Sequence, residues 1–96
     1  MTTAVPEDLQ KIEAELKRRL PWVRCEWDLP ENPNGDYSLD VRIGGKHVVV
    51  EIAPERIYGV SLLIDDTLPS GKPDKVFQPQ EREDMLTHVV GLFLNN

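Results

Sequence analysis

The side chains in this sequence that could transfer protons or bind metals are two histidines, one cysteine and scattered carboxylates. His47 lies near Asp40 and Glu51, and alternate positions on neighbouring strands could bring these three together as a general acid and base. Such a site would suit a small enzyme or a ligand-binding protein using the outer face of a sheet around His47 and Glu51. Catalysis also needs a pocket that excludes water, whereas the exposed face of an antiparallel sheet is flat or convex. We therefore expect no catalytic residue here and interpret these side chains as a solvated strand surface.

The spacing of possible metal ligands matches no known site. No C-x-x-C or H-x-x-x-H pattern includes Cys25 or the histidines, although zinc sites use such short spacings. Asp65, Asp66 and Asp74 lack the alternating acids and the terminal glutamate of a calcium loop. Gly44-Gly45 is not followed by a Lys-Ser/Thr pair at a helix start, so it does not resemble a phosphate-binding loop. We expect neither a metal nor a cofactor.

Length and charge restrict the classes of partner. The 96 residues fit one domain, over residues 1–96, and a hydrophobic share of 40% is ordinary for a globular chain. A net charge of -6 repels phosphate backbones, so we expect no nucleic acid partner. A single cysteine, no secretion signal and no apolar run of about 20 residues favour a cytoplasmic protein that binds no membrane.

Two helices are expected at the ends of this stretch of sequence. Pro6, followed by two acids, is typical of a helix start, and Pro21 ends the helix. Its apolar residues recur at helical spacing, at Leu9, Ile12, Leu16 and Leu20. Gln78, Pro79 and Glu81 form a second start signal, a capping box, before a helix that runs to the end of the sequence.

Between these helices the apolar residues alternate, which predicts four strands. The first strand carries Cys25 on its apolar side. Pairing Ile43 with Lys46 across a two-residue turn at Gly44-Gly45 places the apolar side chains of both strands on one face. A three-residue loop, Pro54 to Arg56, keeps the fourth strand, Ile57 to Ile64, in the same register. We interpret Asp65 to Lys75 as a loop.

The expected fold is α+β: a two-layer sandwich of a four-stranded antiparallel meander sheet with the N- and C-terminal helices on one face (α-β-β-β-β-α). This order resembles the double-stranded RNA-binding domain, which has one strand fewer and a basic start to its last helix. Here that helix begins Gln78-Pro79-Gln80-Glu81-Arg82-Glu83-Asp84. The resemblance therefore concerns topology, and no RNA-binding residue is implied.

The second helix carries more apolar residues than one buried face needs. Met85, Val89, Leu92 and Phe93 fill a core-facing stripe, and Leu86, Val90 and Leu94 lie beyond it. Either the first helix or the 65–75 loop covers this flank, or a second copy or another protein does. We hypothesise that Leu86, Val90 and Leu94 contact a homodimer partner or an unknown protein. The predicted function is a non-enzymatic protein–protein interaction or regulatory module that self-associates.

Overall fold

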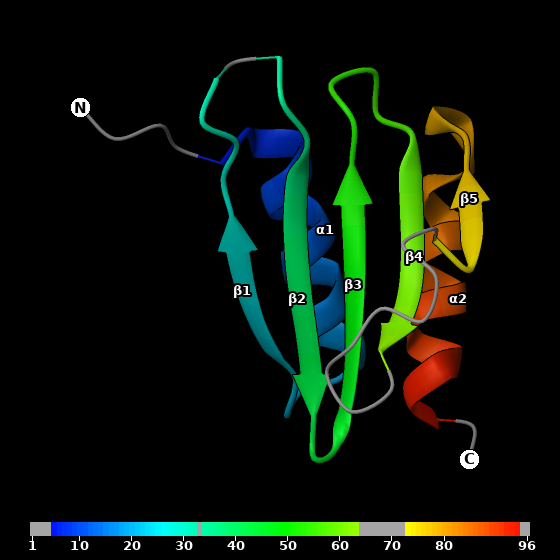
Figure 1. Cartoon of the computed structure of the whole chain (residues 1–96). Helices are drawn as coiled ribbons and strands as arrows, with labels where there is room; N and C mark the ends of the chain where they lie inside the picture. The colour runs from blue at the N-terminus through cyan, green and yellow to red at the C-terminus, as the bar shows by residue number, and fades with distance from the viewer. Residues whose placement is uncertain (1–4, 33, 64–72, 95–96) are drawn as a thin grey trace.

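The computed structural model describes residues 5–32, 34–63 and 73–94 and has the α+β fold expected from the sequence. Figure 1 shows an antiparallel meander sheet with a helix from each end of the chain packed behind it. The elements are α1 (Glu7–Arg19), β1 (Arg24–Asp28), β2 (Tyr37–Ile43), β3 (Lys46–Ile52), β4 (Tyr58–Leu63), β5 (Lys75–Phe77), the 3-10 helix η1 (Pro79–Glu81) and α2 (Arg82–Leu94). No helix in the described ranges is long and apolar enough to cross a membrane.

The predicted number of four strands is wrong, because the sheet has five, in the order β1-β2-β3-β4-β5. β5 pairs antiparallel with β4, with Phe77 opposite Tyr58. It was missed because it has three residues, of which only Phe77 is buried, so it shows no alternation of apolar and polar residues. Lys75, the last residue of the predicted loop, begins this strand. The rest of that loop up to residue 72, and Ile64 of the predicted fourth strand, lie outside the described residues.

The register predicted for the central hairpin is confirmed. Ile43 lies opposite Lys46, Val41 opposite Val48, and Leu39 opposite Val50. Gly44 has a φ of 58°, as the first central residue of a type II′ turn requires, and this turn preserves the right-handed twist of both strands. The inner face of β2 and β3 is therefore apolar except at Lys46, whose Nζ donates to the Leu92 carbonyl oxygen of α2 at 2.9 Å.

The three-residue connection between β3 and β4 is also confirmed by the pairing. Ile52 lies opposite Tyr58, and the Ala53 N–H donates to the Ile57 carbonyl oxygen at 3.0 Å. Arg56, the last residue of the loop, has a φ of 69°. Loops of this length place their last residue in the left-handed region, so Arg56 occupies a position that usually favours glycine.

Both helices begin as the sequence predicts, with one shift in position. Pro6 is the N-cap of α1 rather than its first residue. Gln78 is the N-cap of η1, and the Gln78 N–H donates to Glu81 Oε1 at 2.8 Å in the predicted capping box. The 3-10 turn leads directly into α2, so this cap anchors the start of the second helix.

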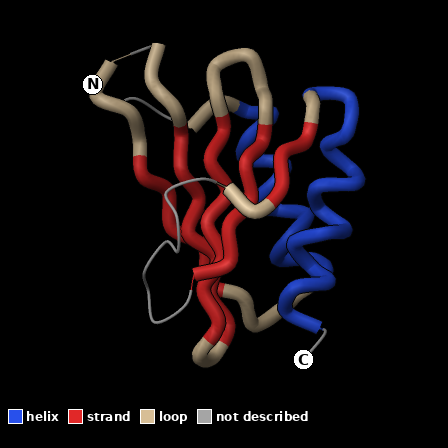
Figure 2. The backbone as a smooth tube through the Cα atoms, turned by 45° about the vertical axis from the view of Figure 1, so that its right-hand side comes forward, coloured by secondary structure: helices blue, strands red, loops and turns tan. Residues whose placement is uncertain are grey.

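Figure 2 shows both helices on one side of the sheet. The hydrophobic core is formed by side chains of the sheet and of the two helices. The inward side chains of β2, β3 and β4 meet the apolar stripe of α1 and the buried side of α2. The fully enclosed side chains are Leu9, Ile12, Leu16, Leu39, Val41, Val48, Val50, Ile52, Val60, Met85 and Val89. The other face of the sheet carries most of the polar side chains of the strands, together with Val49 and Leu63.

Candidate functional site

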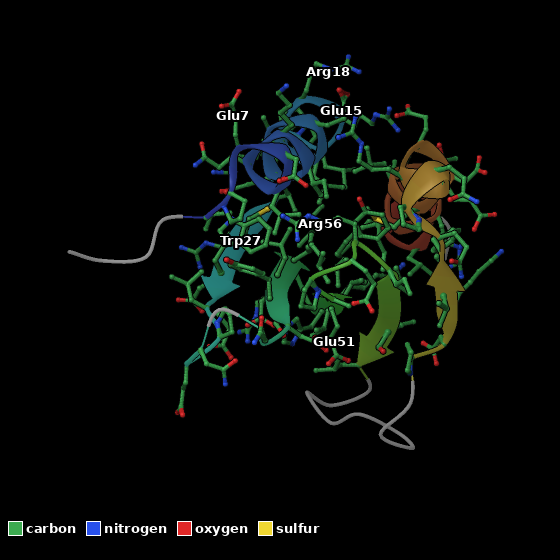
Figure 3. All side chains as sticks on the ribbon, turned by 90° about the horizontal axis from the view of Figure 1, so that it is seen from above. Glu7, Glu15, Arg18, Trp27, Glu51 and Arg56 are labelled. Carbon is green, nitrogen blue, oxygen red and sulfur yellow. The ribbon has the colours of Figure 1, made fainter. Side chains whose placement is uncertain are left out.

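The outer face of the sheet brings together two of the three residues that the sequence suggested for acid–base chemistry. His47 Nε2 lies 3.2 Å from Asp40 Oδ1, from neighbouring strands. His47 is only 8% exposed, so it is more buried than a solvated strand residue. Glu51 lies opposite Ser38 and Gly59, four residues farther along β3 and so about 13 Å away. Figure 3 shows Glu51 on the side of the sheet away from the helices.

A shallow hollow of about 280 Å³ lies over β1 and β2, lined by Arg24, Cys25, Glu26, Asp40 and Arg42. Across the ladder, Arg24 lies opposite Arg42 and Glu26 lies opposite Asp40, so like charges face each other. Directly opposed like charges destabilise a strand pair. Within the described ranges, neither Arg24 nor Glu26 forms an ion pair. The hollow therefore presents two side-chain charges of β1, Arg24 and Glu26, that form no ion pair with any described residue.

Ser61 on β4 is a buried hydroxyl on the same face. It is 1% exposed, and its Oγ has no hydrogen-bond partner among the residues that the structure describes. An unsatisfied buried hydroxyl costs about 1–3 kcal/mol of stability. We expect Ser61→Ala to raise the free energy of unfolding by about 0.5–2 kcal/mol, measured by urea denaturation.

The matched control for this change is Ser38→Ala, which removes a partly exposed hydroxyl from the same face, on β2. That change should alter stability by less than about 0.5 kcal/mol. A Ser61→Ala protein that is less stable than the wild type would show that the hydroxyl contributes a favourable contact.

A second pocket, of about 420 Å³, lies where both helices begin, and its lining includes Asp8, Arg56, Tyr58 and Arg82. Arg56 Nε donates to Asp8 Oδ2 at 2.6 Å, and Arg56 Nη2 donates to Oδ1 at 3.3 Å. The hydrogen bond from Arg56 holds the pKa of Asp8 below its usual value. Burial raises the pKa of the Tyr58 phenol. Figure 3 shows Arg56 between the two helices, where its pairing ties the β3–β4 turn to α1.

Metal and thiol chemistry receive little support from these positions. Among residues 5–32, 34–63 and 73–94, no group of three or more His, Cys, Asp or Glu side chains could hold a metal ion. The predicted position of Cys25 on the apolar side of β1 agrees with its packing against the core. Burial raises the pKa of the Cys25 thiol to about 11. A thiol that is protonated at neutral pH is a poor nucleophile.

The three residues expected to form an interface on α2 are buried to different extents. Leu86 is only 3% exposed, Val90 packs partly against the core, and Leu94 is 68% exposed. α2 contacts α1 as well as β4 and β5, so it buries a wider arc than a helix that touches a sheet alone. The chain itself therefore covers Leu86 and part of Val90, and Leu94 is the most exposed of the three.

The edge of the sheet at β1 is a feature that the sequence analysis did not single out. β1 is the first strand in the sheet order, and it is the one described strand without a buried residue. Trp22, just before it, is 81% exposed. Trp27 packs on the core only in part, and its Nε1 donates to Glu13 Oε1 of α1 at 2.7 Å. Figure 1 shows α1 behind β2, with no described element beyond β1.

The pairing pattern shows which backbone groups this edge presents. The two-residue turn makes Ile43 and Lys46 a hydrogen-bonded pair, and such pairs alternate along antiparallel strands. In β2, the odd-numbered residues therefore bond to β3 and the even-numbered residues bond to β1. Since Arg24 lies opposite Arg42, the even-numbered residues of β1 direct their N–H and C=O groups toward β2. Cys25 and Trp27 therefore direct theirs away from the sheet, toward the open edge.

Among the described residues, the β1 edge combines an exposed indole, partly buried apolar side chains and backbone groups that no other strand pairs with. Such a surface can bind another polypeptide by adding a strand to the sheet. Comparison of the chain with models of protein families, with curated proteins and with solved structures finds no match.

Proposed function

We propose that this chain is a non-enzymatic protein–protein interaction or regulatory module that associates with a second copy of itself. The observation that supports the proposal is the β1 edge, where Trp22 is 81% exposed and no strand residue is buried. Exposed apolar groups beside polar ones mark protein interfaces, and two-fold homodimers are the commonest oligomers. Association at the β1 edge would bury the parts of Cys25 and Trp27 that remain exposed.

Sedimentation velocity and light scattering should detect this association directly. Over about 1–200 µM protein, the mass should rise from that of one chain, 11.0 kDa, to twice that mass. A mass of one chain across this range, together with no protein recovered in a pull-down, would overturn the proposal.

Two exposed apolar side chains, one next to β1 and one at the end of α2, allow a matched comparison. Trp22→Ser removes apolar surface at β1, and Leu94→Ser removes it at the end of α2. We expect Trp22→Ser to weaken dimerisation by about tenfold or more, since buried aromatic residues dominate interfaces. Leu94→Ser should leave the dimer unchanged, and the reverse result would assign the contact to Val90 and Leu94 of α2.

A ligand-binding protein or small enzyme on the outer sheet face is the second candidate. The contact of His47 with Asp40 and the nearby hollow favour it. A metabolite screen by thermal shift tests this candidate, because a ligand that binds the folded chain raises its melting temperature. A hit that is lost in His47→Gln but kept in Glu51→Gln would place binding at the Asp40–His47 pair.

A further inference from the structure

The charged side chains at two positions of β1, Arg24 and Glu26, form no ion pair with any described residue. Arg24 and Glu26 are both exposed and point to the same side of the sheet. Their partners across the ladder, Arg42 and Asp40, carry the same sign. A strand that paired with the open edge of β1 could neutralise both residues. It would have to place an acidic side chain opposite Arg24 and a basic one opposite Glu26.

The β1 strand of a second copy of the chain carries these two charges at the required spacing. We infer that two copies of the chain, self-associating as proposed above, pair their β1 strands antiparallel around a two-fold axis at Cys25. Arg24 of each copy then faces Glu26 of the other, which gives two opposite-charge pairs. The assignment rests on the proposed self-association and adds to it the interface and its register.

The charges select this register over its neighbours. Two-fold pairing keeps each face of the sheet continuous only when residues of the same parity face each other. An axis at Glu26 would place the two Glu26 carboxylates against each other, and an axis at Trp27 would oppose Glu26 and Asp28 twice. The axis at Cys25 is the arrangement of these three without a like-charge contact, and like charges directly opposite each other are destabilising.

Backbone and core groups fit the same arrangement. Cys25 directs its N–H and C=O groups to the open edge, so the two Cys25 residues exchange two backbone hydrogen bonds. On the inner side, Val23 of each copy faces Trp27 of the other, and both are apolar. Trp27, which packs on the core only in part, would then be covered. The two five-stranded sheets become one continuous sheet.

Charge reversal tests the pairing quantitatively. Arg24→Glu should raise the dimer dissociation constant by about tenfold or more, because both opposite-charge pairs become repulsive. Glu26→Arg should do the same. An equimolar mixture of the two variants should regain a dimer of wild-type affinity or better, since every pair is again opposite in sign. Unchanged affinity in both single variants would overturn the assignment.

Disulfide trapping reports the register independently of affinity. In a Cys25→Ser background, Arg24→Cys and Glu26→Cys place thiols at exposed positions. The pairs that face each other here are non-hydrogen-bonded, with Cα atoms about 4.5 Å apart, within the range of a disulfide. With copper phenanthroline as oxidant, the mixed variants should cross-link to each other, and neither should cross-link to itself.

Each alternative result has its own meaning. Self-cross-linking of the Glu26→Cys variant would move the axis to Glu26 and overturn the register. A wild-type dimer by light scattering, with no cross-link in any mixture, would overturn the β1 interface and leave self-association intact. A wild-type monomer at all concentrations would overturn both the interface and the proposed function. Circular dichroism of each variant confirms that the monomer is folded.

Discussion

Replacing Leu39 with alanine should lower the free energy of unfolding by about 2–5 kcal/mol. Leu39 is fully buried on β2, between Trp27 of β1 and Val50 of β3. The change removes apolar contacts on both sides and leaves a cavity that strands held by their ladder hydrogen bonds cannot close. Urea denaturation followed by circular dichroism measures the difference.

The control for this prediction is Leu94→Ala, which makes the same chemical change at a residue that is 68% exposed. It should alter stability by less than about 0.5 kcal/mol. Both proteins must be compared at one low concentration, because dimerisation would add to apparent stability. A Leu39→Ala protein within about 1 kcal/mol of the wild type would show that the core around β2 can rearrange to fill the space.

Alkylation of Cys25 by iodoacetamide should be slow, and its rate should keep rising with pH to about 11, where burial places the pKa of the thiol. At pH 8 the thiolate fraction is roughly a hundredfold below that of an unperturbed cysteine. A more basic thiolate recovers part of this loss through its greater nucleophilicity, so the expected rate is lower by at least about tenfold. Intact-mass spectrometry against time measures the rate.

The neighbouring position provides the matched control. Glu26→Cys in the Cys25→Ser background places a thiol one residue away but on the exposed side of the strand. It should react at the rate of an ordinary cysteine. Equal rates for the two thiols would show that Cys25 is more accessible than its packing against the core indicates.

The strand registers could be predicted because successive side chains of a strand point to opposite faces, so few pairings keep all apolar side chains on one face. A shift of one residue between β2 and β3 would turn Val48 and Val50 to the outer face. The same reasoning predicted the three-residue loop before β4. This loop places Arg56, which is not a glycine, at a positive φ. β5 could not be found this way, because three residues with one buried side chain carry no period.

The candidate site was harder to predict, because a sequence pattern gives the face of an element and not its neighbours. The sequence predicted an apolar flank on α2 but left open whether α1, the 65–75 loop or another chain covers it. Leu86 could therefore not be assigned to the core, where contact between α2 and α1 places it. The pairing of His47 with Asp40 depends on a diagonal contact between strands. The β1 edge was overlooked because Cys25 and Trp27 alternate like core residues, although nothing described covers them on one side.

The shortness of β5 limits how far assembly through the sheet can continue. If two β1 strands pair, the edges that remain in the dimer are the two β5 strands, each of three residues and each beginning with Lys75. Very short, lysine-bearing edge strands are poor templates for another strand. The proposed pairing at β1 would be two-fold and would use each copy's β1 edge, so it would close at two chains. If the proposed pairing occurs, the fold would therefore limit β-strand addition to a finite dimer and disfavour an open filament.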